Sequence, residues 1–395
     1  MWTRVAIIVL CLAMLTGCWS RRELNEILIV LGVGLDWEEG EYLVSFQVVS
    51  PSEISAQKKT GERPPGSLFQ GRGKTVFEAA RAVTAEAPRK MYFGHLQLYV
   101  VSEALAKKGV HDFIDNILRD NELRMDFNLV VARGTRAENV LKLYTPIEKL
   151  PTYSMLQSLR NSEKLWAPTV SITMDEVLDR LSGDGYELAL TGIQLFGDPK
   201  AGDSPGNVKS FLPSRRYRYK GIAVFKGDRL VGWLNEKESK GYTDITDNLR
   251  SSTIELPCGS RHYIGIEITS SETKMKADLV EDTPVVTIGL RTEAAVVNMP
   301  CKHIDLTDPA AISKLEEESA LSIKSNAIAA VKRAKALQSD VFGFGNQLGK
   351  DHPAYWKRIR DDWNEKYFPE AKIRYDIKVF IRKTGTTGNT TLKKS

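Results

Sequence analysis

One serine stands at the spacing of a hydrolase nucleophile. Gly202-Asp203-Ser204-Pro205-Gly206 matches the G-x-S-x-G elbow, in which a serine between a strand and a helix attacks a carbonyl carbon. That elbow stabilises the oxyanion with the backbone N–H of the residue after the serine, and Pro205 has no N–H. The surrounding stretch is rich in Gly, Ser and Pro, so we interpret it as a flexible linker and not as a catalytic turn.

A second stretch looks like the end of a phosphate-binding loop. Gly71-Arg72-Gly73-Lys74-Thr75 ends with the required Gly-Lys-Thr order, but the complete motif needs a glycine where the chain has Leu68. No strand pattern directly precedes the stretch. Thr75 as the N-cap of a following helix explains it without a nucleotide.

The histidines do not form a metal-binding pattern, because none of them pairs at i, i+4 with another histidine or with a cysteine pair. They are His95, His111, His262, His303 and His352. We interpret His95, at the start of a strand, as a buried, hydrogen-bonded residue. No pair of acids stands out as a general acid and base. We therefore predict no cofactor, no metal, no catalytic residue and no enzymatic activity.

Cys258 and Cys301 are the only cysteines beyond the N-terminal segment. In a long hairpin that turns at Glu281-Asp282 they would lie near each other without directly facing. An exported protein permits a disulfide. The sequence leaves two alternatives for this pair, a disulfide or two free thiols.

The order Leu15-Thr16-Gly17-Cys18 follows an apolar run, Val5 to Leu15, of the length of a secretory h-region. That run would be only about 16 Å long as a helix, too short to span a bilayer. An aliphatic residue, two small residues and cysteine resemble the lipobox of bacterial lipoproteins. The resemblance implies that the Cys18 sulfur carries a diacylglyceryl group and that cleavage leaves Cys18 as the first residue. The alternative is an ordinary secretory peptide with an accidental cysteine.

Composition favours globular domains. The chain has 395 residues, 42% hydrophobic and 27% charged, which suits two or three domains with their own cores. The net charge of +5 is small for this length and argues against nucleic acid as a partner. The basic and aromatic stretch Arg215 to Lys220 is interpreted as a linker entering an edge strand; contact with a partner or an anionic lipid surface is the alternative. No segment after the signal has about 18 consecutive apolar residues.

Strand and helix patterns alternate along the chain, which predicts a mixed α/β fold (α+β). In the N-terminal half we expect a hairpin, a long exposed loop, and then alternating helices and strands. The expected elements are a hairpin of 27–36 and 42–49, a loop at 51–73, helices at 76–87 and 109–120, strands at 95–101, 125–132 and 186–196, and mainly helices at 135–182.

The C-terminal half opens after the linker. We expect a hairpin of 221–225 and 229–234, long strands at 260–280 and 283–297, a helix from Asp308-Pro309 to about Ser339, a helix at 353–366 and a strand at 371–381. We divide the chain into a signal peptide (1–17), an N-terminal region (18–197), a linker (198–214), a C-terminal domain (215–383) and a disordered tail (384–395).

Several stretches together resemble the C-subunit lipoproteins of bacterial spore germinant receptors, the GerAC-type family. They are WSRRELNEILIVLGV at 19–33, FGHLQLYVV at 93–101 with 113–134, AVFKGDRLVGWL at 223–234, VFGFGNQLGKDHPAYWKRIRDDWN at 341–364, and IRKTG at 381–385. They occur in order over most of the chain. Ser20 departs from the acidic residue common in the family.

The resemblance implies three domains, each with a mainly antiparallel or mixed sheet flanked by helices, with a division near residue 140. It implies a lipid-anchored accessory subunit at the outer face of the spore inner membrane. Its partners would be the polytopic B-type and the A-type receptor subunits and the bilayer itself. Only Cys18 carries over as a functional residue, for lipid attachment. The alternative is a free-standing extracytoplasmic solute-binding lipoprotein, which predicts two similar lobes about a hinge.

Overall fold

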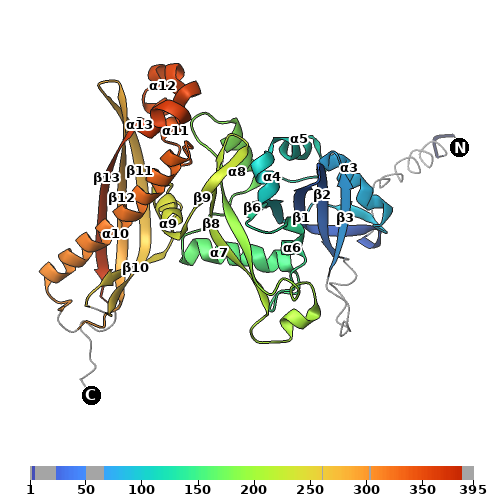
Figure 1. Cartoon of the computed structure of the whole chain (residues 1–395), viewed down its shortest axis with the longest axis horizontal. Helices are drawn as coiled ribbons and strands as arrows, with labels where there is room; N and C mark the ends of the chain where they lie inside the picture. The colour runs from blue at the N-terminus through green and yellow to red at the C-terminus, as the bar shows by residue number, and fades with distance from the viewer. Residues whose placement is uncertain (1, 5–23, 50–65, 260, 302–303, 385–395) are drawn as a thin grey trace.

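The computed structural model describes residues 2–4, 24–49, 66–259, 261–301 and 304–384. These residues form two β-sheets flanked by helices, which confirms the predicted mixed α/β class. Figure 1 shows the chain laid out along the long axis, from the N-terminal strands at one end to a long hairpin and its covering helix at the other. We call the N-terminal sheet sheet 1 and the C-terminal sheet sheet 2.

Sheet 1 is a mixed, nine-stranded sheet within the described part of the chain, in the order β3-β2-β1-β5-β6-β7-β8-β9, with β4 beside β1. Its central strands β1, β5, β6 and β7 run parallel, whereas the strands at either end are antiparallel. The strands are β1 (Ile27–Glu38), β2 (Glu41–Val49), β3 (Ser67–Gly73), β4 (Lys90–Tyr92), β5 (Leu98–Ser102), β6 (Asn128–Ala132), β7 (Ala189–Gly197), β8 (Arg215–Lys226) and β9 (Arg229–Leu234).

Helices cover both faces of sheet 1. Phe113 and Leu105 lie in the core on one face, and Leu141 and Met155 lie in a separate cluster on the other. Double coverage explains why β5 and β6 are buried at every position, since neither face meets water. The helices are α3 (Val76–Ala82), α4 (Glu103–Lys108), α5 (His111–Arg119), α6 (Ala137–Leu141), α7 (Pro151–Leu165) and α8 (Met174–Ser182), with short helices at Leu24–Glu26, Val83–Ala85 and Pro205–Val208.

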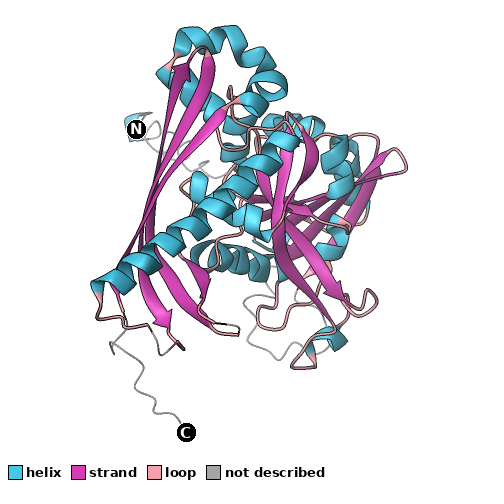
Figure 2. Ribbon diagram, turned by 60° about the vertical axis from the view of Figure 1, so that its left-hand side comes forward, coloured by secondary structure: helices cyan, strands magenta, loops and turns pink. Residues whose placement is uncertain are grey.

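Sheet 2 has the order β10-β11-β12-β13, and its strands are long. They are β10 (Ser252–Pro257), β11 (Tyr263–Val280), β12 (Thr283–Asn298) and β13 (Lys372–Lys383). One face packs on α10 (Pro309–Ala336), which Figure 2 shows lying along the sheet. Burial alternates along β13, as expected for a sheet with one face in solvent.

Four further helices join the two sheets. They are α9 (Glu236–Ile245), α11 (Phe344–Asp351), α12 (Pro353–Ile359) and α13 (Phe368–Glu370), with short 3₁₀ and π segments at Arg360–Asp362 and Trp363–Tyr367. α9 crosses α10 closely at Gly241, where a Cβ atom would collide with the backbone of Asn326. This close approach explains a glycine in the middle of a helix, where its backbone entropy is unfavourable.

The strongest sequence patterns are confirmed. Asp308 caps α10 by accepting from Ala310 N at 2.9 Å, and the long hairpin turns at Glu281-Asp282 with Val280 opposite Thr283. Thr75 caps α3 through the amide of Glu78 at 3.1 Å. The predicted loop at 51–73 is wrong in its last part, because Ser67–Gly73 forms β3 against β2. Residues 51–65 lie outside the described residues.

Cys258 and Cys301 form a disulfide with a Cα–Cα distance of 6.2 Å. Strand β10, which no sequence pattern predicted, explains the pairing. It turns back into β11 at Cys258, whose amide donates to the carbonyl oxygen of His262 at 3.0 Å. Cys301 follows β12 at the same end of the sheet, because Asn298 pairs with Gly265. The disulfide therefore joins the end of β10 to the segment that follows β12, across the end of β11.

The segment 198–214 joins β7 to β8, which are neighbouring strands of sheet 1. The strands on either side of the proposed division near residue 140 meet through only two registered pairs, Val131 with Gly192 and Ala132 with Ile193. The division of the chain into domains stays a prediction.

Candidate functional site

Cys18 lies outside the described residues, so its role in lipid attachment stays a prediction. The first described elements after it are the short 3₁₀ helix Leu24–Glu26 and β1. β1 pairs with β2, β4 and β5, which makes it a central strand of sheet 1. A tether at Cys18 would thus be joined by a short segment to the interior of the fold and not to a peripheral strand.

The two apparent motifs have structural roles. Gly71 and Gly73 lie where β3 touches α3, and a side chain at either position would collide with the backbone of Ala79. Ser204 is exposed in the β7–β8 loop, and its carbonyl oxygen accepts from the amide of Asn207 at 3.1 Å. The first stretch does lie between a strand and a helix, β3 and α3, but Leu68 stands where the phosphate-binding loop needs its first glycine. Ser204 is followed only by the short 3₁₀ helix Pro205–Val208, and Pro205 has no N–H for an oxyanion.

Two buried carboxylates organise backbone segments. Asp36 accepts from the amides of Ala137 at 2.8 Å and Glu138 at 3.0 Å, at the N-terminus of α6. Burial raises the pKa of Asp36 to about 6, against the opposing effect of the Ala137 amide. Because both oxygens accept from structural N–H groups, this carboxylate positions a helix and is not free for acid–base chemistry.

The second carboxylate, Asp340, directly precedes the VFGFGN stretch at 341–346. It accepts from Gly345 N at 2.7 Å and from Trp363 Nε1 at 2.8 Å, and it also accepts from the amides of Phe342 and Gly343. Burial raises the pKa of Asp340 to about 6. We call these five residues the Asp340 cluster; its role is to fix the chain between α10 and α11.

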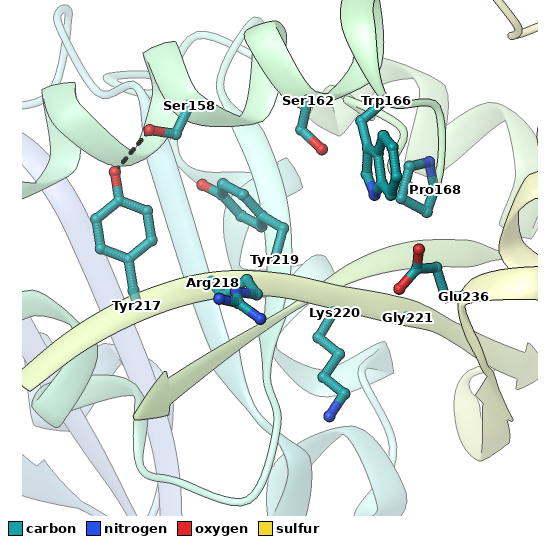
Figure 3. A pocket seen from close by; sticks show the side chains of 10 residues that line it. All are labelled: Ser158, Ser162, Trp166, Pro168, Tyr217, Arg218, Tyr219, Lys220, Gly221 and Glu236. Atoms are coloured by element: carbon teal, nitrogen blue, oxygen red, sulfur yellow. Dashed lines mark hydrogen bonds between the residues drawn. The ribbon is translucent and has the colours of Figure 1, made fainter. Parts of the chain in front are cut away.

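A groove of about 730 Å³ separates α7 from the first half of β8 (Figure 3). We call it the α7–β8 groove. Ser158 and Ser162 line it from α7, and Trp166 lines it directly after that helix. Tyr217 to Gly221 line it from β8, with Pro168 and Glu236 at one end. The segment Arg215–Lys220, interpreted as a linker entering an edge strand, is itself the start of β8. Its alternating basic and aromatic residues are visible in the sequence.

The two tyrosine hydroxyl groups in this groove are both bonded to α7. Tyr217 Oη lies 2.8 Å from Ser158 Oγ and 3.0 Å from Ser154 Oγ. Tyr219 Oη donates to the carbonyl oxygen of Met155 at 2.7 Å, and burial raises the pKa of Tyr219. These bonds attach α7 to β8. The groove thus has the form of a binding surface and not of a site with an activated nucleophile.

Trp166 separates the groove from a second hollow beside α9, β10 and α10. The Nζ atom of Lys240 lies 3.9 Å from the centroid of the Trp166 ring. Burial lowers the pKa of Lys240, and burial also raises the pKa of its neighbour Asp244 to about 8, with the Lys240 charge opposing that rise. This pair is desolvated where the two sheets meet. No sequence signal marked it, because a Lys and an Asp at i, i+4 are ordinary on a helix surface.

The described ranges contain no group of three or more His, Cys, Asp or Glu residues that could hold a metal ion. Within the same ranges, none of the helices combines the length and the apolarity that crossing a bilayer requires.

Both halves of the chain match sequence models of known protein domains. Residues 20–195 match the sequence model of the spore germination protein N-terminal domain, and residues 220–385 match the spore germination B3/GerAC-like C-terminal model. Together the two matches span most of the chain in order. The chain belongs to the GerAC-like family of spore germination proteins, which confirms the resemblance seen in the sequence.

Relatives align over nearly their full length. Spore germination protein KC of Bacillus subtilis is 29% identical over 97% of this chain and 96% of its own. Spore germination protein A3 of the same organism is 24% identical over 98% of each chain. The crystal structure of the GerBC protein aligns with a TM-score of 0.53 at 19% identity, covering 89% of this chain and 97% of that one. The last comparison shows a shared fold.

Proposed function

We propose that this chain is a lipid-anchored accessory subunit of a nutrient germinant receptor in spores. It would be tethered through Cys18 at the outer face of the inner membrane and would assemble there with the A-type and B-type subunits. The observation that carries the proposal is the ordered match of both GerAC-like regions over the chain, directly after a lipobox. Relatives that align end to end are named spore germination proteins.

Tethering gives Cys18 a mechanical role. Restricting a protein to a membrane raises its effective concentration near membrane partners. Two acyl chains give stable attachment where one gives only marginal binding. The α7–β8 groove and the closed hydrogen-bond networks of the buried carboxylates support a role in binding and assembly, with no catalytic step assigned to any residue.

The solute-binding alternative predicts two similar lobes about a hinge. The two sheets are instead unlike in strand number, strand length and helix coverage. We therefore keep the receptor-subunit proposal as the one that the fold supports best.

The first experiment compares spores that carry Cys18→Ala with spores that carry Cys11→Ala, a cysteine within the apolar run. Dipicolinate release after addition of amino acids or sugars is measured beside the amount of the chain in the inner membrane. We expect Cys18→Ala to lose both membrane retention and the nutrient response, and Cys11→Ala to keep both. A deletion strain with a full response across the nutrient panel contradicts the receptor role. Full retention of Cys18→Ala contradicts lipid attachment.

A further inference from the structure

Half of one edge of β8 has no neighbouring strand. β8 pairs with β7 from Arg215 onward, but its pairing with β9 begins only at Ile222. Among the described residues, no strand lies along the second edge of Arg215–Gly221. This open edge is the stretch that forms the floor of the α7–β8 groove.

The direction of the backbone groups can be followed from the bonds at the start of β8. Asp198 N donates to the carbonyl oxygen of Ser214 at 3.0 Å, so the backbone carbonyl of Ser214 points toward β7. The backbone N–H and C=O groups of the next residue, Arg215, point the other way. Its amide donates to Asn207 Oδ1 and its carbonyl oxygen accepts from Asn207 Nδ2, both at 2.9 Å. The buried Asn207 side chain thus occupies the edge as a short piece of strand would.

Backbone direction alternates along an antiparallel strand. The backbone groups of Tyr217 and Tyr219 therefore point to the open edge, beyond Asn207. Asn207 limits this edge at one end, and β9 limits it at the other from Ile222 onward. Because unpaired N–H and C=O groups are a template for another strand, this short stretch can accept an extended peptide.

Side chains along the open edge separate by face. The rings of Tyr217 and Tyr219 turn toward α7, where their hydroxyls are bonded. Arg216, Arg218 and Lys220 alternate with them and are exposed. One face of an added strand would thus meet Trp166 and the tyrosines, and the other face would meet three cations.

These cations have no acidic partner in the described part of the chain: no carboxylate lies within ion-pair distance of Arg216, Arg218 or Lys220. Arg218 and Lys220 lie instead over the Phe196 ring, at 5.5 and 5.7 Å from its centroid. Arg133 is a separate cation on the β7 side of this stretch, since its Nη1 donates to the carbonyl oxygen of Lys220 at 3.3 Å. The outer side of the open edge is therefore positively charged and uncompensated.

We propose that the open edge of β8 binds an extended segment of a protein partner whose side chains alternate between acidic and apolar. The segment adds as a strand beside Tyr217 and Tyr219. Its apolar side chains enter the α7–β8 groove against Trp166, and its acidic side chains face Arg216, Arg218 and Lys220. This inference deepens the proposed function, since it gives a subunit of a membrane assembly a surface for one of its partners.

The test uses the purified full chain in detergent micelles and fluorescent peptides as probes. The first probe is a peptide of four Val-Glu repeats, and the second has Lys in place of Glu. Two further probes are Val-Glu repeats methylated on the amide nitrogens of either all Val or all Glu residues. Fluorescence anisotropy gives Kd for each. We expect the acidic peptide to bind, the basic one not to bind, and one of the two methylated peptides to lose binding, because only one set of amides faces β8.

A charge-reversal variant tests the cations, and the chain offers a matched control. Arg216→Glu/Arg218→Glu/Lys220→Glu changes the open edge of β8. Lys372→Glu/Arg374→Glu/Lys378→Glu makes the same change at exposed positions of β13, another edge strand. We expect the β8 variant to weaken binding of the acidic peptide at least about tenfold and the β13 variant to leave Kd within about twofold.

Three outcomes overturn the proposal. Equal losses in both variants mean that net charge alone attracts the peptide. Equal binding of both methylated peptides to the unchanged chain excludes strand addition, and this result does not depend on how any variant folds. Binding of phosphatidylglycerol vesicles that needs the β8 cations, without binding of any peptide, assigns the surface to lipid. All these measurements use purified protein, so a failure here leaves the result for Cys18 in spores unaffected.

Discussion

The two sheets of this molecule bury their apolar side chains in different ways. Sheet 1 has helices on both faces, and β5 and β6 are buried at every position. Sheet 2 has a covering helix on one face only, and β13 alternates between buried or half-buried and exposed positions. A sheet covered on one face buries less apolar area for each residue, so it depends more on individual contacts at its ends.

The individual contacts of the C-terminal half can be named. The disulfide joins the end of β10 to the segment after β12. The Asp340 cluster holds the segment after α10, and Asp308 caps α10. In sheet 1 the comparable contact is Asp36, which has two amide donors at the start of α6. The comparison predicts that removing single contacts costs more stability in the C-terminal half than in the N-terminal half.

The largest expected effect is at Asp340. Replacing Asp340 with Ala leaves three backbone amides and Trp363 Nε1 without their acceptor in a fully buried site. We expect a loss of roughly 3–5 kcal/mol in the free energy of unfolding, since each unsatisfied buried group costs about 1–3 kcal/mol. Urea unfolding followed by tryptophan fluorescence measures it, with Trp363 as a local reporter.

Asp36→Ala is the matched variant in sheet 1, because Asp36 is equally buried but accepts from two amides. We expect Asp36→Ala to lower the free energy of unfolding by roughly 2–3 kcal/mol. An effect at Asp36 equal to or larger than the effect at Asp340 would break the comparison between the two halves.

The disulfide is the next contact to remove. Cys258→Ser/Cys301→Ser opens a cross-link between residues 43 apart in the sequence. Such a cross-link stabilises mainly by restricting the unfolded chain, and we expect a loss of about 2–4 kcal/mol. Hydrogen exchange of the full chain should show faster exchange in β10–β12 and unchanged exchange in β5 and β6. A count of two free thiols from these cysteines in the denatured Cys18→Ser chain would contradict the bond itself.

Strong local signals account for what the sequence predicted correctly. Asp308-Pro309 is a preferred start for a helix, and the alternating strands on either side of Glu281-Asp282 required a hairpin. The family resemblance had the same basis, since its motifs lie in β1, β5, β8–β9 and the Asp340 cluster.

Elements were missed where tertiary contacts override local preference. β3 follows a Pro- and Gly-rich stretch, and its glycines serve the contact with α3 instead of a loop. α9 contains Gly241, which lowers helix propensity but permits the crossing with α10. The α7–β8 groove could not be predicted, because Ser158 carries no pattern until Tyr217 lies opposite it. Of this surface only the alternation of cations and aromatic residues in β8 was visible.

Asp244 gives a pH-dependent contrast with the hydrogen-bonded carboxylates. Burial raises the pKa of Asp244 to about 8, so the folded chain holds its proton more tightly than the unfolded chain. Unfolding then releases a proton, and stability falls as the pH rises toward the folded pKa. Between pH 6 and pH 8 we expect Asp244 to account for a loss of about 2 kcal/mol.

Urea unfolding at these two pH values tests this loss. Asp244→Asn should remove it, because the amide does not titrate. Glu255→Gln is the matched control, since Glu255 is an exposed acid that also acts on Lys240. It should leave the pH dependence as it is. A loss that persists in Asp244→Asn would assign the effect to another group.

We expect the smallest effect when either of two helix caps is removed. Asp308 caps α10, the cover of sheet 2, and Thr75 caps α3, one of several helices over sheet 1. Replacing either with Ala removes one side-chain acceptor and should cost about 1 kcal/mol locally. If sheet 2 depends on single elements, Asp308→Ala speeds hydrogen exchange throughout α10 and into β13, whereas the effect of Thr75→Ala stays within α3. Asp308→Asn keeps an acceptor oxygen and should exchange as the unchanged chain does. Faster exchange confined to the first turn of α10 would mean that the helix is held by its packing alone, so the contrast between the sheets would then rest on the disulfide and the Asp340 cluster.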